Sequence, residues 1–226
     1  LFGNNVQITI TDFNVSGNSA PNSGSGLGGG IYLENSSGSM EAGNVFSNNA
    51  FQGGGLFLQT QTMIDMERIS IYNNIASQNG GGMLLISHSN PHLNNCTIVN
   101  NVCQGGSSHQ GGGISSVNGS NPTIVSSVLY DNEPAQIDFY YNEQDPAGVT
   151  ISYSNIEGGQ DSIVTYDNGT INWGAGNIDV DPLFVSASEN NFHLFATSQM
   201  INSGHPDYLD ADGSVADMGA YFYENN

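Results

Sequence analysis

The chain carries almost no positive charge. Its 226 residues include one arginine, Arg68, and no lysine, against 21 aspartates and glutamates, which gives a formal net charge of -20. Without cations a protein cannot neutralise the phosphates of a nucleic acid or dock electrostatically on an anionic membrane surface. The same charge repels acidic polysaccharides unless a divalent cation bridges the two. We therefore expect no nucleic-acid partner.

Long apolar runs are missing as well. No stretch approaches the roughly 18 apolar residues that a transmembrane helix needs, so we expect no membrane span. The first five residues include neither a methionine nor a basic residue, which favours a mature or trimmed fragment over a precursor. The acidic residues gather late in the chain, with five before residue 131 and the other 16 from there to the end.

Two motifs repeat in phase with each other. One is a glycine triplet followed by apolar residues, with copies that start 25, 27 and 31 residues apart: Gly28–Leu33, Gly53–Leu58, Gly80–Leu85 and Gly111–Ser116. The other ends in Asn, with an earlier, divergent copy at Val15–Asn18: Phe46–Asn49, Ile71–Asn74, Ile98–Asn101 and Leu129–Asn132. Two motifs repeating together predict a solenoid, in which each repeat buries its apolar face against its neighbours.

The local pattern within each repeat favours strands. The first 130 residues lack a convincing period of 3.6 residues and the dense leucine framework of a leucine-rich repeat. Period-2 alternation instead points Ile69 and Ile71 into the core, and Arg68, Ser70 and Tyr72 outward.

The glycines and asparagines suit the corners between strands. Asn tolerates the left-handed conformation of a sharp turn, and Asn side chains stacked on successive coils are expected to hydrogen-bond along a ladder. The glycine triplets are expected where a corner needs positive φ or a close backbone approach.

At this point the two motifs resemble the repeats of right-handed parallel β-helix passengers, such as the chlamydial polymorphic outer membrane proteins. The resemblance covers about residues 1–132, and only Phe46–Asn49 keeps the aromatic residue of that family's second motif. It implies a fold rather than an activity.

The end of the chain is similar to the closing segment of many secreted bacterial β-helix proteins. The matching blocks, in order, are Asp179–Phe184, Phe192–Leu194, Ile201–Asp207, Asp210–Gly213 and Ala216–Tyr221. His205 stands where those proteins usually have an acidic residue. The resemblance implies secretion and an extracellular or cell-surface location.

We predict an all-β fold, a single-stranded right-handed parallel β-helix with about three strands per coil. Residues 1–132 are expected to form regular coils, and residues 133–226 less regular coils with an acidic C-terminal segment of the same domain. Roughly eight coils spaced by about 4.8 Å would give a rod about 40 Å long.

The signatures of polysaccharide-degrading enzymes with this fold are missing. A lyase needs a base and a cation beside the substrate carboxylate, but only Arg68 is available, and its neighbour Glu67 favours a solvent-exposed ion pair. A hydrolase needs facing carboxylates, and the Gly-His-Gly and Arg-x-Lys motifs of polygalacturonase-like enzymes do not occur. We therefore favour a non-catalytic adhesin, stalk or self-assembling matrix component. A polysaccharide lyase or hydrolase is the alternative.

Calcium is the cofactor that the sequence suggests. Asp207, Asp210, Asp212 and Asp217 concentrate carboxylate oxygens around a glycine, as calcium loops do, although the closing Glu of an EF-hand is missing. The alternative is an acidic turn whose carboxylates accept hydrogen bonds from backbone N–H groups.

Aromatic residues late in the chain suggest a glycan partner. Tyr140, Tyr141 and Trp173 are candidates for a stacking platform on a solenoid face, although alternation sends about half of the late aromatics into the core. The other predicted partner is a second copy stacked end to end, because an uncapped solenoid end is an unpaired sheet edge. Cys96, predicted to point inward, and Cys103 form either two buried thiols or a short-loop disulfide.

Overall fold

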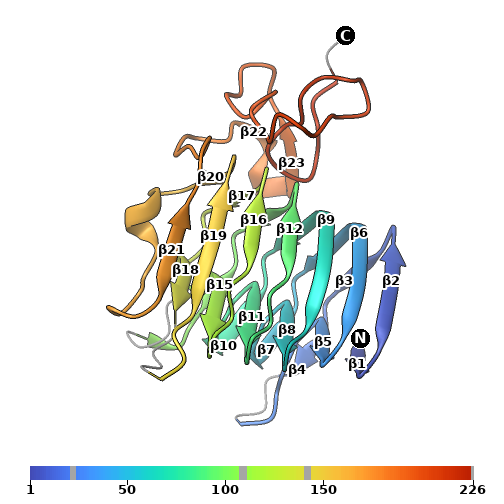
Figure 1. Ribbon diagram of the computed structural model, residues 1–226. Coiled ribbons are helices and arrows are strands. Elements are labelled where there is room, and N and C mark those ends of the chain that lie inside the picture. The colour runs from blue at the N-terminus through green and yellow to red at the C-terminus, as the bar shows by residue number, and fades with distance from the viewer. Residues whose placement is uncertain (21–23, 107–110, 140–143, 225–226) are drawn as a thin grey trace.

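The computed structural model describes residues 1–20, 24–106, 111–139 and 144–224, and the chain coils into a parallel β-solenoid (Figure 1). Three parallel sheets run along the solenoid, and the described residues contain no α-helix. Two short 3-10 turns, η2 (Gln160–Ser162) and η3 (Ala187–Glu189), are the helical elements described. No described helix is long and apolar enough to cross a lipid bilayer. The predicted all-β solenoid is confirmed.

The strands of each coil pair with the equivalent strands of the coils on either side. The first sheet has six strands: β1 (Phe2–Asn4), β5 (Ile31–Glu34), β8 (Leu56–Gln59), β11 (Met83–Ile86), β15 (Gly111–Val117) and β18 (Ala135–Phe139). The second has four: β4 (Ser19–Ala20), β7 (Asn49–Gln52), β10 (Ile75–Asn79) and β14 (Val102–Cys103).

The third sheet has 11 strands and bends at a corner that divides it into two limbs. β6 (Ser37–Phe46) and β9 (Met63–Tyr72) run through the corner, which they turn at Ala42 and Arg68 with positive φ. The first limb also contains β2 (Gln7–Thr11), β12 (His92–Asn94), β16 (Thr123–Val125), β19 (Gly148–Ser152) and β21 (Thr170–Trp173). The second limb also contains β3 (Asn14–Ser16), β13 (Thr97–Val99), β17 (Val128–Tyr130) and β20 (Asn155–Ile156).

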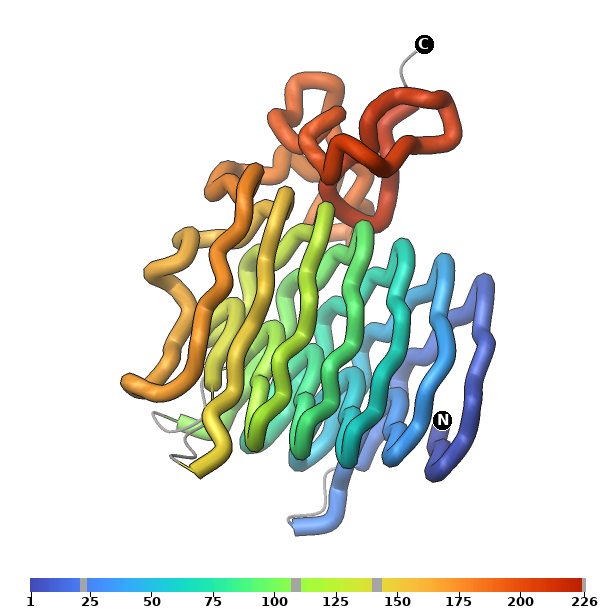
Figure 2. Tube along the Cα trace, viewed as in Figure 1, coloured from blue at the N-terminus to red at the C-terminus, as the bar shows by residue number. Residues whose placement is uncertain are grey.

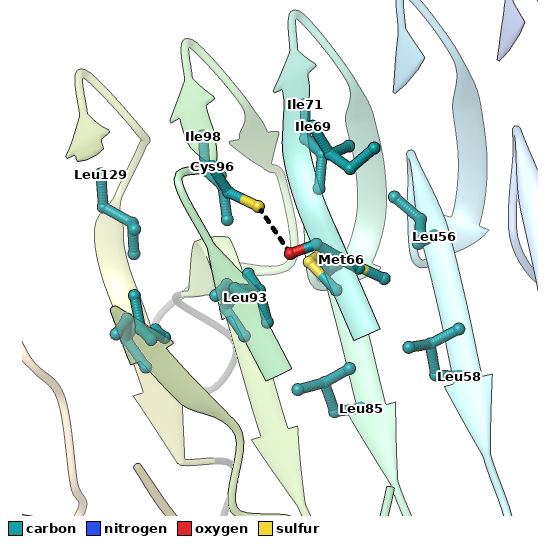
Figure 3. Close-up of a cluster of buried hydrophobic side chains, with 14 of the residues drawn as sticks. Leu56, Leu58, Met66, Ile69, Ile71, Leu85, Leu93, Cys96, Ile98 and Leu129 are labelled. Carbon is teal, nitrogen blue, oxygen red and sulfur yellow. Dashed lines mark hydrogen bonds between the residues drawn. The ribbon is translucent and has the colours of Figure 1, made fainter. Parts of the chain in front are cut away.

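The core is a stack of aliphatic side chains, one layer per coil, that lies between the three sheets (Figure 3). Ile69 and Ile71 point into it as the alternation predicts, and Cys96 and Ile98 take the equivalent places one coil later. Each layer is buried only by the layers above and below, which is why a single repeat has no fold of its own.

The asparagine ladder predicted at one corner is present. Asn48 donates from its backbone N and its Nδ2 to Asn74 Oδ1, both at 3.0 Å, and Asn74 makes the same two bonds to Asn101. Asn101 continues the ladder to Asn132, and Asn18 begins it. The residue just before each ladder Asn has positive φ: Gly17, Ser47, Asn73, Asn100 and Asp131.

The strand register shifts one copy of the asparagine motif by one residue from the alignment that the sequence suggests. Val45, rather than Phe46, pairs with Ile71, so the ladder residue of this coil is Asn48 rather than Asn49. In Asn73–Asn74 and Asn100–Asn101 the first residue makes the left-handed turn and the second satisfies buried backbone groups, whereas Ser47 and Asn48 take these two roles one coil earlier.

The glycine triplets occupy another corner, where backbones of successive coils almost touch. Gly53 has a φ of 64°, and a Cβ on Gly54 would lie 2.4 Å from the carbonyl oxygen of Gly81 in the next coil. Only glycine fits here, as predicted. A third corner has a hydroxyl ladder that the sequence did not reveal: the N–H groups of Ser36, Thr62 and Ser89 donate to the side-chain oxygen one coil later.

The last part of the chain leaves the coils, and we call residues 182–224 the C-terminal strap. The strap contains the antiparallel pair β22 (Phe184–Ser186) and β23 (Asn191–Leu194), and it folds back over the second limb of the third sheet (Figure 2). The expectation of about eight coils was therefore too high, because the first sheet has six strands and the strap adds none.

The strap buries outward-facing residues that the sequence places in solvent. Tyr72 points away from the core, but Phe192 of the strap packs against its ring at a centroid distance of 5.2 Å, and Tyr72 is 8% exposed. Ala220 N donates to Thr97 Oγ1 at 2.9 Å, and Asn95 Nδ2 donates to the carbonyl oxygen of Asp217 at 2.7 Å. Ser70, predicted outward, is also buried.

The two cysteines are buried thiols. Cys96 is completely buried and Cys103 is 5% exposed, and no disulfide joins them. Burial raises the pKa of the Cys96 thiol to about 12 and that of Cys103 to about 11. Neither thiol is a nucleophile at neutral pH, because the thiolate is the reactive form.

Candidate functional site

A hollow lies where the strap meets the corner of the third sheet. It is an open cleft of about 780 Å³, and we call it the Arg68 cleft. The solenoid supplies one wall and the strap the other: Glu67, Arg68, Asn94 and Asn95 face Asp207–Ala211, Gly219, Ala220 and Phe222. Its volume falls in the range of about 300–1,000 Å³ that is usual for small-molecule sites.

We call the boundary between the strap and the solenoid the seam, and Arg68 lies on it. Its guanidinium donates to Glu67 at 2.7 Å and to Glu41, with all three side chains nearly half exposed. The exposed ion pair expected from the sequence is confirmed, with Glu41 as an additional partner. Arg68 also lines two smaller hollows of about 460 and 220 Å³ along the same seam.

The strap wall is held in place by hydrogen bonds to three aspartates. Asp217 is fully buried, and its two carboxylate oxygens accept hydrogen bonds from the N–H groups of Asn202 and Tyr223 at 2.7 and 2.6 Å. Asp210 Oδ2 accepts from the N–H of Asp217 at 2.8 Å, and Asp212 Oδ1 accepts from Ser214. These bonds fold the acidic segment, residues 207–217, into tight turns.

Burial perturbs the ionisation of two of these groups. The pKa of Asp210 is raised to about 6, chiefly by loss of solvent. The Asp217 and Asp212 carboxylates also raise this pKa, whereas the N–H of Asp217 and the Arg68 guanidinium lower it. Burial also raises the pKa of Asp217, although its two N–H donors favour the charged form.

The four predicted calcium ligands are only partly brought together. Asp210 and Asp217 are neighbours, but Asp217 points into the protein, and the side chain of Asp207 is 85% exposed. Throughout the described ranges, no three His, Cys, Asp or Glu side chains gather as a metal site would require. The hydrogen bonds are those of the acidic turn that was the alternative to a calcium loop. Calcium binding stays a prediction.

Of the predicted glycan-binding aromatics, Trp173 does not line the cleft. Tyr140 and Tyr141 are outside the described residues, and Trp173 packs against the solenoid core from the last coil. The aromatic groups of the cleft are instead Tyr208 and Phe222 of the strap. Tyr208 is 41% exposed, and its ring rests on His205 at a centroid distance of 5.0 Å.

A row of outward apolar residues is the sequence signal for this site. Phe46, Tyr72, Val99 and Tyr130 occupy one outward position on successive coils, paired by the register of the third sheet. An apolar row on the outer face of a solenoid indicates that another segment covers it. The strap that provides this cover also builds the cleft.

One buried polar atom in the cleft wall is unsatisfied. Asn94 Oδ1 is shielded from solvent, yet it receives no hydrogen bond within the described part of the chain. Its neighbour Asn95 is engaged, because Asn95 Nδ2 donates to the carbonyl oxygens of Asp217 and Gly219. A buried acceptor without a donor costs about 1–3 kcal/mol, so this atom is a local source of instability in the cleft wall.

Comparison with known proteins identifies the coiled part of the chain. A family model described as a right-handed β-helix region matches residues 1–181, which are the residues before the strap. No curated protein and no solved structure matches the chain.

Proposed function

We propose a non-catalytic, extracellular or cell-surface role for this chain, which belongs to the family of right-handed β-helix regions. In this role the solenoid is a rigid support and the Arg68 cleft binds a glycan. The likeness of the repeats to polymorphic outer membrane protein passengers, and of the strap to the closing segment of secreted bacterial β-helix proteins, supports display outside the cell.

The cleft is the observation that carries the proposal. Sugars bind through hydroxyl groups, which pair with carboxylates and amides, and through apolar ring faces, which pack on aromatic side chains. The Arg68 cleft offers both kinds of surface: Glu67, Asn94 and Asp210 are polar, and Tyr208 and Phe222 are aromatic. Such a mixture in one concave site is typical of ligand binding.

The charge of the cleft limits the class of glycan that it can bind. Its single cation, Arg68, is already bonded to two glutamates, and the rest of the chain adds no lysine or arginine. An acidic polysaccharide would meet several carboxylates and no available cation, so we expect it to be repelled.

A glycan array followed by titration calorimetry tests the proposal. Tyr208→Ala removes the exposed ring of the cleft, and we expect it to weaken glycan binding about 5- to 10-fold, which corresponds to about 1 kcal/mol or more. Phe2→Ala is the matched control, because Phe2 is 65% exposed on the first sheet. An array without any binding to neutral or amino sugars, with and without Ca²⁺, would refute the proposal.

Hydrolysis of the glycan is a second candidate, favoured by one observation. Asp210, whose pKa is about 6, and the exposed Glu67 line the same cleft, and carboxylates with different environments are the usual acid and base of glycosidases. A reducing-sugar assay across polysaccharides, with 235-nm absorbance to detect lyase products, distinguishes the two functions. Product formed by the wild type but lost in Asp210→Asn would establish an enzyme.

End-to-end stacking is a separate proposal supported by the first coil. Its inward residues Ile8, Ile10, Phe13 and Val15 are only partly buried, and Leu1 and Phe2 are exposed. A second copy stacked on this coil would cover them and pair the sheet edge. Light scattering and negative-stain microscopy test this, and only monomers at high concentration would refute it.

A further inference from the structure

We propose that the Arg68 cleft selects an amino sugar, meaning a glycan unit that carries a protonated amine, over neutral and N-acetylated sugars. The inference rests on the proposed glycan-binding function and names the class of ligand for that cleft.

Hydrogen-bond acceptors predominate in the cleft. Glu67, Asp207 and Asp210 contribute carboxylate oxygens to its walls. A neutral hydroxyl both donates and accepts, whereas an ammonium group has three donors and no acceptor. The ammonium group is therefore the better complement to these walls.

The donors of the cleft are largely engaged within the protein. Arg68 donates to Glu41 and Glu67, and Asn95 Nδ2 donates to two strap carbonyls. The backbone N–H of Asp207 donates to His205 Nδ1, and that of Asp210 donates to the carbonyl of Ser214. A ligand with acceptor groups finds few donors here.

Charge and aromatic groups favour the same ligand. Three carboxylates line the cleft against one arginine, and Glu41 binds that arginine from outside the cleft. A ligand cation would be attracted by this excess of negative charge. Tyr208 and Phe222 add ring faces, which attract cations within about 6 Å.

The spacing of the acids favours an organic cation over a bare metal ion. Calcium needs six to eight oxygens converging at about 2.4 Å, and no three acidic or histidine side chains converge in the described residues. A ring with one ammonium group needs only one or two carboxylates, with the remaining walls contacting the sugar. An open cleft of about 780 Å³ fits that description.

Titration calorimetry at pH 6.5 with four ligands tests the inference: a β-linked glucosamine pentamer, its fully N-acetylated form, the corresponding glucose pentamer, and spermidine. We expect the glucosamine pentamer to bind at least about 10-fold more tightly than either neutral pentamer, with affinity that falls as salt rises from 50 to 300 mM. Glu67→Gln and Asp210→Asn are each expected to lower that affinity about 5-fold or more.

A control variant and the pattern of ligands bound distinguish a failure of the amine preference from a failure of the glycan function. Asp161→Asn removes the same charge from an exposed turn, η2, and is expected to bind like the wild type. Equal binding of all three pentamers would overturn the amine preference while leaving the glycan function intact. No binding of the glucosamine pentamer would overturn the amine preference, whereas the glycan function would fall only if the glycan array were silent as well. Spermidine binding as tightly as the glucosamine pentamer would overturn the inference by showing that charge alone is recognised. Because Glu67 lies on the solenoid wall, Glu67→Gln decides the matter even if Asp210→Asn unfolds the strap.

Discussion

Removing one rung of the asparagine ladder should destabilise the whole solenoid. Asn74 is completely buried and makes four side-chain hydrogen bonds at about 3 Å. Its Oδ1 accepts from the N and Nδ2 of Asn48, and its Nδ2 donates to Val45 O and Asn101 Oδ1. Asn74→Ala breaks all four and leaves their partners buried.

The expected loss of folding stability follows from those four hydrogen bonds. At about 1 kcal/mol for each net hydrogen bond, Asn74→Ala is expected to lower the free energy of unfolding by about 4 kcal/mol. Asn18→Ala is the control within the same ladder, because Asn18 is an exposed end rung and its backbone N–H still donates to Asn48 Oδ1 in the variant. We expect a loss below about 1 kcal/mol there.

Guanidinium unfolding, followed by far-ultraviolet circular dichroism and by the fluorescence of the single tryptophan, Trp173, measures both variants. Asn74→Asp provides a further comparison, because it keeps the shape and the acceptor oxygens but cannot donate. We expect it to be at least as destabilising as Asn74→Ala at pH 7, since it also buries a charge. If Asn74→Ala lost no more stability than Asn18→Ala at equal m-values, the ladder would not be a source of stability.

Four other predictions concern corners, thiols and carboxylates. Gly54→Ala should lower the free energy of unfolding by more than about 3 kcal/mol, because its Cβ would meet backbone oxygens of the next coil. Gly17→Ala, whose Cβ would have no atom within 4 Å, should cost only the roughly 1–2 kcal/mol of its positive φ. The same denaturation assay measures both. Alkylation at pH 8 should modify neither Cys96 nor Cys103 until the protein is denatured, and an intact mass that rises on reduction would contradict the buried thiols. The melting temperature should rise as pH falls from 7 to 5, because the raised pKa of Asp210 makes the folded state bind a proton more readily than the unfolded state. Asp210→Asn should flatten this rise. Parallel plots of melting temperature against pH for the variant and the wild type would disprove the assignment to Asp210. If the acidic segment holds calcium, EDTA should lower the melting temperature and Ca²⁺ should restore it, and an unchanged curve would leave the segment as a hydrogen-bonded turn.

The coils could be predicted from the sequence because their rules are local. Alternation decides which side of a strand faces the core, and a repeated motif places the same residue on every coil. This was enough for the inward positions of Ile69 and Ile71 and for the ladder of asparagines. It left a one-residue ambiguity at Asn48 and Asn49, where two neighbouring asparagines both fit and the strand register decides.

The strap and the cleft could not be predicted in this way. Their contacts join residues more than 100 positions apart, such as Asn95 with Asp217 and Thr97 with Ala220, and no periodicity relates the partners. The composition did single out two of the components, the only arginine and the late group of aspartates. That these lie across one cleft depends on how the strap packs against a row of outward apolar residues.

The strap also decides how the molecule carries a mechanical load. Its hydrogen bonds reach back to Asn44 on β6, Thr97 on β13 and Ser126 before β17. Tension between residue 1 and residue 224 would therefore pass through the strap into the middle of the solenoid. Part of the load would thus bypass the coils of β19 and β21, which follow these attachment points in the chain.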